Sequence, residues 1–201
     1  MVKDLGIFVD RTLSFSSHVS SIVAKARSRC AIYFKSFISR DTQTMIKFFT
    51  IYVRPLLEYC SVAWNPTNQR DINSLERVQR YFTSKISFCS TFTYSQRLSM
   101  LSLHSLQFRR TVADITFLYS LVSGGYEISL APHLTYINPS ITRGHNLKIL
   151  PPLLHYTHSL QNFLSRSAPI WNALPTSAFN FTSRSAFRNN INNLLHDPFL
   201  V

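Results

Sequence analysis

The acidic side chains would have to support any metal-dependent or acid–base chemistry, and the chain has only nine Asp and Glu in 201 residues. Phosphoryl transfer of the polymerase kind needs carboxylates that converge on paired Mg²⁺ ions about 3.5–4 Å apart. No two aspartates are adjacent in the sequence. Asp4 and Asp10 flank one apolar run, and in a single regular strand they would lie about 20 Å apart. The acids therefore predict no two-metal site.

Three of the acids have simpler explanations as structural groups. Asp41 precedes an apolar pattern with helical spacing and is predicted to be the N-cap of that helix. Glu58 follows Arg54 by one helical turn, and Glu76 precedes Arg80 by one turn. Both glutamates are therefore expected to form solvated pairs on helix surfaces.

Nucleophilic catalysis has no better support. The sequence contains no G-x-S-x-G motif. His145 ends an Arg-Gly-His turn, where a histidine is more often a structural hydrogen-bonding residue than a catalyst. Cys30, Cys60 and Cys89 include no C-x-x-C pair, which predicts reduced, buried thiols and argues against zinc. We expect a protein without enzymatic activity, metal or cofactor, located inside the cell in the nucleus or the cytoplasm.

The charge balance indicates a polyanionic partner. Twenty-one Lys and Arg face nine Asp and Glu, which gives a net charge of +12 and a pI near 10.1. A globular protein this basic is suited to nucleic acid. The longest apolar stretches, 48–53 and 115–122, are far shorter than the about 20 residues of a membrane span, and the acidic N-terminal run is not a signal peptide. We expect RNA and DNA backbones as partners, with neither a membrane nor a small-molecule substrate.

Basic residues on predicted helix faces are the candidates for phosphate contacts, which carry no sequence information and make binding sensitive to salt. A solvated helix face is the alternative for each of them. Tyr81 or Tyr94 could stack on a base, although a buried core position is the favoured interpretation. Trp64 and Trp171 are expected in the core. The candidates are Lys25, Arg29, Arg77, Arg80 and Lys85, followed by Arg109 and Arg110.

Apolar residues at helical spacing predict a mainly α fold. One helix is expected from Ser16 or Ser17 to about Phe37. A second begins after Asp41, kinks or restarts at Pro55 and continues to Trp64. Further helices are predicted over 71–86, 95–101, 105–122 with a C-cap at Gly124 and Gly125, 160–173 and 183–195.

Three regions follow from this pattern. Residues 1–15 predict a short strand and a turn, and residues 16–125 predict a helical domain. Residues 126–201 are rich in Pro, Ser, Thr and Asn, and predict a loop-rich α+β segment with one strand at 146–150.

Four segments carry motifs that occur together in one family of proteins. Residues 4–19 read D-L-G-I-F-V-D and then L-S-F-S-S-H-V. Residues 52–82 contain Y-V-R-P-L-L-E-Y, W-N-P and L-E-R-V-Q-R-Y-F, the most specific set. Residues 94–114 contain L-S-L-H-S-L and R-R, and residues 143–187 contain R-G-H and W-N-A-L-P. In this order and spacing, over almost the whole chain, they resemble the C-terminal region of LINE-type reverse transcriptases of the jockey and chicken-repeat kind.

The resemblance implies the thumb and C-terminal part of a non-LTR retrotransposon reverse transcriptase, an RNA-directed DNA polymerase. In such enzymes the helical thumb packs on the palm and grips the template–primer backbone. Residues 16–125 are therefore expected to be a thumb-like bundle, with the missing palm domain as a further partner. The family's catalytic Asp-Asp motif precedes the first segment, so the active site is expected to be absent from this chain.

Two other functions stay open at this point. The first is a basic helical protein-interaction module whose surface serves solubility or an acidic partner. The second is a non-functional retroelement remnant. In that case the strand at Leu5–Val9 would expose an unpaired apolar edge, which favours aggregation.

Overall fold

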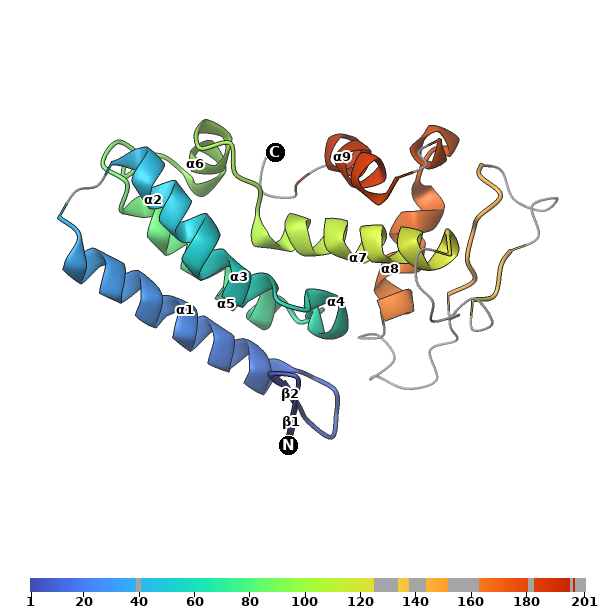
Figure 1. Ribbon diagram of the computed structural model, residues 1–201, viewed down its shortest axis with the longest axis horizontal. Coiled ribbons are helices and arrows are strands. Elements are labelled where there is room, and N and C mark those ends of the chain that lie inside the picture. Colours follow the sequence, from blue (N-terminus) through green and yellow to red (C-terminus); the bar gives the residue numbers. More distant parts are fainter. Residues whose placement is uncertain are drawn as a thin grey trace. The chain divides into compact units, whose positions relative to one another are not determined.

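The protein is mainly helical, with a two-stranded antiparallel sheet at its N-terminus (Figure 1). This computed structural model describes residues 1–38, 41–124, 134–137, 144–151, 163–180, 183–195 and 197. The predicted mainly α fold class is confirmed. Packing divides the chain into two compact units. Unit 1 comprises Met1–Arg109 and Asp197–Val201, and unit 2 comprises Arg110–His196.

The N-terminal residues form a hairpin, and the prediction of one strand is wrong. β1 (Val2–Asp4) pairs antiparallel with β2 (Ile7–Val9). The turn between them is possible because Gly6 has a φ of +88°, a left-handed conformation that glycine adopts without steric cost. Ile7 is buried in the core of unit 1. The run Ile7–Val9 therefore pairs within the chain, which corrects the expectation of an unpaired strand.

Helix α1 (Ser16–Ser36) begins and ends within a residue of the prediction. Val19, Val23 and Ala26 of its predicted apolar face are buried, whereas Phe37, predicted on the same face, is exposed. The loop before α1 is organised by Asp10, whose carboxylate accepts hydrogen bonds from the backbone amides of residues 12, 14 and 15 and from two hydroxyl groups.

The second helical arm changes its winding at Pro55, as predicted. It consists of α2 (Thr42–Phe48), the π-helix η1 (Phe49–Val53) and α3 (Arg54–Glu58). Asp41 caps α2 by accepting the Thr44 N–H at 2.9 Å, which confirms the predicted cap. The predicted continuation to Trp64 is interrupted, because Cys60 has a φ of 51° and only then does α4 (Ser61–Trp64) begin.

Helices α5 (Gln69–Ser84) and α6 (Tyr94–Met100) complete unit 1 together with the start of α7 (Leu106–Val122). Four apolar residues of α5 that were predicted to face the core are buried, namely Ile72, Leu75, Val78 and Phe82. Ile86, just beyond the end of α5, and Trp64 are buried as well. Tyr33, Phe48, Phe49 and Phe82 form an aromatic cluster in this core. Such clusters bury large apolar areas and fix the helices against one another.

Unit 2 contains the rest of α7 with α8 (Phe163–Ala173), a 3₁₀ turn (Thr176–Phe179) and α9 (Arg184–Leu194). Both predicted C-terminal helices are present, although residues 160–162 lie outside the described ranges. Trp171 is fully buried, and Phe187 stacks on Tyr119 at 4.0 Å. The strand predicted at 146–150 is reduced to one bridge between Tyr136 and Ile149.

The division between the units differs from the boundary predicted at residue 126. It lies inside α7, between Arg109 and Arg110. A single continuous helix belongs to both units because its first turn packs on unit 1 and its later turns pack within unit 2. Within the described ranges, the helices include none that combines the length and the apolar character needed to cross a membrane.

Candidate nucleic-acid interface

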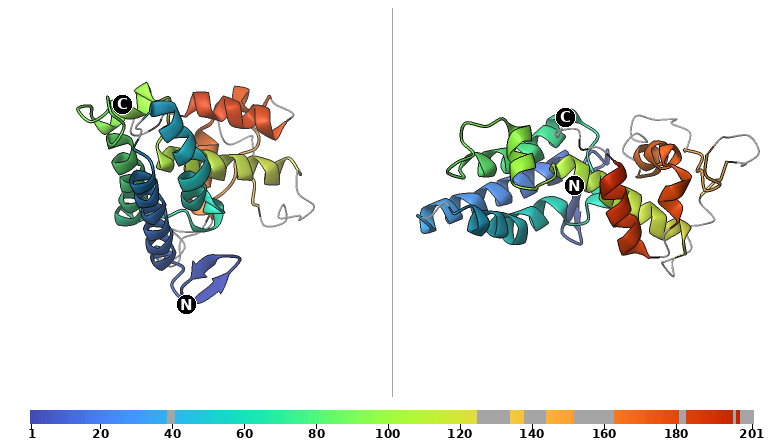
Figure 2. Two further views of the ribbon diagram at one scale, coloured as in Figure 1. Left: turned by 60° about the vertical axis from the view of Figure 1, so that its left-hand side comes forward. Right: turned by 90° about the horizontal axis from the view of Figure 1, so that it is seen from above.

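Helices α1 and α5 lie side by side and run in the same direction (Figures 1 and 2). At their starts, the Ser16 hydroxyl donates to the Asp71 carboxylate at 2.5 Å. Near their ends, the rings of Phe34 and Phe82 are 5.3 Å apart. These contacts hold the two helices together near both ends. Two adjoining hollows, each lined by residues of both helices, form a groove along their junction, which we call the α1–α5 groove.

The first part of the α1–α5 groove is a polar hollow of about 420 Å³. Arg27 of α1 and Arg70 and Arg77 of α5 line it, and all three are exposed. None of these three guanidinium groups forms an ion pair in the described part of the chain. This hollow therefore presents uncompensated positive charge to solvent.

The second part is a more apolar hollow of about 590 Å³ that adjoins the first, since Arg27 and Arg77 line both. Ala31 and Val78 supply apolar surface, and the ring of Tyr81 forms part of the wall. Among the described residues, the side chains that line either hollow include no carboxylate. Arg80, Ser84 and Arg97 complete the lining of the second hollow.

Arg97 is buried in the lining of this second hollow, with 7% of its surface exposed. One guanidinium nitrogen donates to the Phe92 carbonyl at 2.9 Å and another, more weakly, to the Arg80 carbonyl at 3.4 Å. Its Nε has no hydrogen-bond partner, and no carboxylate of the described residues pairs with it. The guanidinium also lies 5.8 Å from the centroid of the Tyr94 ring. A buried cation without a carboxylate partner favours an anion nearby.

The structure brings three of the seven predicted phosphate-contact residues to this groove. Arg77 and Arg80 line it, and Lys85 lies beside it with its ammonium 5.3 Å from the Tyr81 ring centroid. Lys25 and Arg29 each lie two residues from Arg27 along α1. Each is therefore rotated about 200° around the helix axis from Arg27, which places it on the opposite face of the helix. Arg29 instead donates to the Tyr52 carbonyl of η1 at 2.5 Å.

The remaining two predicted residues are occupied inside the fold, and this corrects the prediction for them. Arg109 forms a two-pronged ion pair with Glu58, with distances of 2.5 and 3.0 Å. Arg110 is buried, with 1% of its surface exposed. The sequence suggested neither outcome, because 51 residues separate Arg109 from Glu58.

Two aromatic predictions have different outcomes. Tyr94 is largely buried, and burial followed by the neighbouring Glu76 carboxylate raises its pKa far above the usual value. Tyr81 is 52% exposed, so the expectation of a core position was wrong for this residue. It immediately precedes Phe82 on α5 and is therefore rotated about 100° away from the core face.

Three groove residues were not among the residues predicted from the sequence: Arg27, Arg70 and Arg97. Arg70 and Arg77 are seven residues apart, two helical turns, and this spacing indicates a shared face of α5. Arg27 falls on the side of α1 that α5 happens to approach, and Arg97 enters from a different helix. No local pattern marks either of these two.

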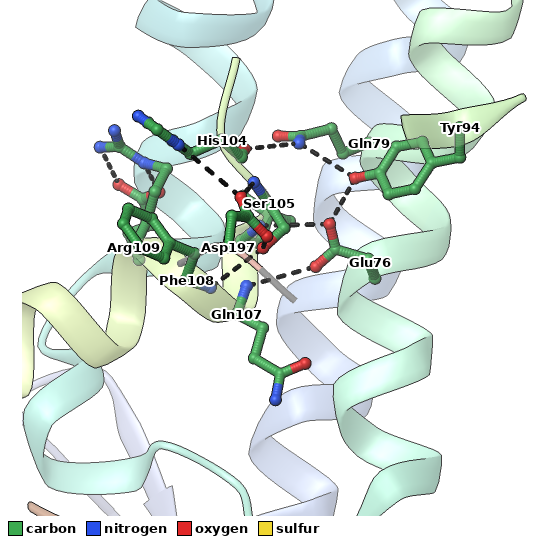
Figure 3. A network of polar contacts seen from close by, with 11 residues as sticks. Glu76, Gln79, Tyr94, His104, Ser105, Gln107, Phe108, Arg109 and Asp197 are labelled. Atoms are coloured by element: carbon green, nitrogen blue, oxygen red, sulfur yellow. Dashed lines mark hydrogen bonds and ion pairs between the residues drawn. The ribbon is translucent and has the colours of Figure 1, made fainter. Parts of the chain in front are cut away.

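A buried network of polar groups connects α5 with α6 and the start of α7 (Figure 3). The Glu76 carboxylate accepts a hydrogen bond from the Tyr94 hydroxyl and from the backbone amides of Leu106 and Gln107 at 3.2 and 3.3 Å. Gln79 donates to the Tyr94 hydroxyl and to a backbone carbonyl. The expectation of a solvated Glu76–Arg80 pair is therefore wrong, because Glu76 is 1% exposed and caps the start of α7.

Asp197, Ser105 and His104 also meet in this region, but their order does not suit nucleophilic catalysis (Figure 3). The Ser105 hydroxyl and amide both donate to Asp197 at 2.6 Å, while His104 lies 3.7 Å from the same carboxylate. A serine nucleophile needs the imidazole as its immediate base. Here the serine hydroxyl is hydrogen-bonded to the carboxylate and not to the imidazole, and Ser105 is fully buried. The arrangement caps the start of α7 and joins Asp197 to it.

The other side chains with chemical potential have structural surroundings. His145 accepts the Leu147 N–H and bonds the Trp171 carbonyl at 3.0 Å, and burial lowers its pKa, as expected of a structural histidine. Cys30 and Cys89 are buried, and burial raises the pKa of Cys30 to about 12. Cys60 is exposed, which corrects the prediction of three buried thiols. Within the described ranges, no three His, Cys, Asp or Glu side chains are grouped to hold a metal ion.

The motif segments of the C-terminal half converge in unit 2. Arg166 pairs with the buried Asp114 at 2.9 Å, and the Trp171 indole donates to the Leu147 carbonyl at 2.6 Å. These residues hold the described part of unit 2 together.

Comparisons with known proteins are sparse. The chain is 29% identical to an uncharacterized protein of Caenorhabditis elegans over 128 residues, which cover 62% of this chain and 65% of the relative. The match thus spans less than two thirds of the relative's own length. No family model matches the chain, and no solved structure matches it.

Proposed function

We propose that this chain is a nucleic-acid-binding fragment of a LINE-type non-LTR retrotransposon reverse transcriptase. It corresponds to the thumb and C-terminal region and has no catalysis of its own. The observation that carries the proposal is the α1–α5 groove, where Arg27, Arg70 and Arg77 stand without carboxylate partners in the described part of the chain. The motif resemblance supplies the family.

The groove suits a polynucleotide backbone for electrostatic reasons. Guanidinium groups bind phosphates through paired N–H donors, and each neutralised phosphate releases condensed counterions. The arginines follow both helices, so several phosphates of one strand can be contacted in succession. A net charge of +12 attracts any polyanion, but only a groove lined with cations fixes where on the surface the polyanion binds.

Salt dependence is the test of this proposal. The dissociation constants of the full chain for single-stranded RNA and for duplex DNA are measured by fluorescence anisotropy over a range of KCl concentrations. We expect log K to fall linearly with log salt, with a slope of several units. Absence of binding, or binding that does not weaken as salt rises, would contradict the proposal and favour a protein-interaction module.

A charge-matched pair of variants locates the surface. Arg27→Ala/Arg77→Ala removes two groove cations, and Lys47→Ala/Arg188→Ala removes two exposed cations elsewhere. The first variant should bind at least about tenfold more weakly and reduce the salt slope by about 1 to 2. The second should change binding much less. Equal losses would mean that net charge alone, without the groove, drives binding.

A further inference from the structure

We infer that the apolar hollow of the α1–α5 groove holds one nucleotide of a single strand, with its base against Tyr81 and its phosphate on the surrounding arginines. This inference rests on the proposed function and goes beyond it. A backbone groove alone would bind duplex and single strand alike, whereas a base pocket requires an unpaired nucleotide.

The lining of the hollow has the chemistry of a base-binding pocket. The hollow combines the exposed methyl group of Ala31 with the exposed ring of Tyr81, and the buried Val78 lies in its lining. Base–aromatic stacking is the usual way in which proteins hold unpaired bases, and it tolerates any sequence because every base has a π-face. A volume of about 590 Å³ lies within the range of ligand pockets and is large enough for a base and its sugar.

The charge of the lining is complementary to a phosphate group. Arg27, Arg77 and Arg80 surround the hollow, and among the described residues its lining includes no carboxylate. Arg97 is 93% buried there, and its Nε has no hydrogen-bond partner. A ligand with an apolar body and an anionic group matches the apolar wall and this excess of positive charge, and a nucleotide is such a ligand.

The ring of Tyr81 is held in a fixed position by its neighbours. Its ring meets Phe34 edge-on at a centroid distance of 6.0 Å, and the Lys85 ammonium is 5.3 Å from its centroid. Phe34 in turn packs on Phe82 in the core of unit 1. The half-exposed ring is therefore held in place before any ligand binds, which reduces the entropy lost on binding.

The test compares strands with and without bases. Full-length protein is titrated with a labelled oligothymidylate of about ten nucleotides, which is within common single-strand site sizes. Competitors are an abasic strand and a duplex, each of equal length. We expect oligothymidylate to bind about fivefold to about 100-fold more tightly than the abasic strand, the range given by stacking one base.

Variants of Tyr81 assign this preference to the pocket. Tyr81→Ala should abolish the preference for oligothymidylate over the abasic strand, and Tyr81→Phe should retain it within about twofold. Tyr52 of η1 is the matched control, because it is similarly exposed at 54%, and Tyr52→Ala should leave the preference unchanged. Binding of the duplex should be the same in all these proteins.

The outcomes separate the two proposals. If abasic strand and oligothymidylate bind equally well and with steep salt dependence, the base pocket is refuted while backbone binding stands. If neither binds, both proposals fail. Displacement of oligothymidylate by an acidic peptide of equal charge, as effectively as by unlabelled oligothymidylate, would also overturn the base pocket.

Discussion

Single carboxylates in this protein act as backbone anchors. Asp10 accepts five hydrogen bonds from Thr12, Ser14 and Phe15 and so fixes the loop that leads into α1. Slight burial acts to raise the pKa of Asp10, but these hydrogen bonds outweigh it and hold the pKa far below its usual range. The ionised form is therefore the one that stabilises the fold.

The sign of the pH dependence follows from that shift. Because the pKa of Asp10 is lower in the folded state, its contribution is complete above the unfolded value of about 3.9 and is lost as pH falls toward the folded value. Asp10→Asn should lower the free energy of unfolding by about 1 kcal/mol or more near neutral pH. The difference from wild type should shrink in acid.

Urea unfolding followed by circular dichroism, between about pH 6 and about pH 3, measures this effect. Asp4→Asn is the matched control, since it removes the same charge from an exposed position in β1. A constant difference between wild type and Asp10→Asn at every pH would refute the assignment.

At the scale of elements, the start of α7 depends on a side chain from α5. The first amides of a helix lack partners within it and need an external acceptor. The Glu76 carboxylate is that acceptor for the amides of Leu106 and Gln107, and the Ser105 hydroxyl accepts the Phe108 N–H. Two helices are thus joined by a buried carboxylate, whose charge is compensated by amides and the Tyr94 hydroxyl.

Glu76→Gln keeps the shape of the side chain but replaces an acceptor oxygen with a donor. We expect the free energy of unfolding to fall by about 1 to 3 kcal/mol, because at least one buried donor loses its partner. Glu58→Gln makes the same chemical change in the partly exposed pair with Arg109 and should cost less than about 1 kcal/mol. Equal costs in thermal or urea unfolding would argue against the capping role.

At the scale of the whole molecule, unit 1 is assembled from two distant parts of the chain. Asp197 returns to it across 92 residues and binds the amide and hydroxyl of Ser105. The carboxylate is buried, so the contact also excludes water from the cap of α7.

A double-mutant cycle of Asp197→Ala and Ser105→Ala measures this long-range contact. Each single variant should destabilise the protein by about 1 to 3 kcal/mol, and the double variant should cost less than the sum. The shortfall reports the coupling across the chain. Additive losses would mean that the two side chains stabilise the fold independently.

Several elements could be predicted because their signals are local. The helical spacing of apolar residues located α1 and α5, Asp41 marked a cap, and Pro55 marked the change of winding. The exceptions also have local reasons. A left-handed Gly6 folds the first residues into a hairpin, and a left-handed Cys60 breaks the arm before α4.

The candidate site could be predicted only in part. Arg77 and Arg80 were identifiable because they share a polar face of one helix, and that face lies in the groove. Arg109 and Arg110 carry the same charge, but Arg109 is ion-paired with Glu58 and Arg110 is buried. The sequence does not distinguish a charged residue that is exposed to solvent from one that pairs with a residue 51 positions away.

The sequence by itself determined the scarcity of acids, the excess of arginine and lysine, and the periodicity that makes the chain helical, because these depend on composition and on neighbours within a few turns. Only the tertiary structure decided which charges remain available. It made Glu76 a buried cap, exposed Tyr81 and placed Arg97 under the groove. Burial and pairing depend on how helices distant in sequence pack, and that packing sets the cost of each charge.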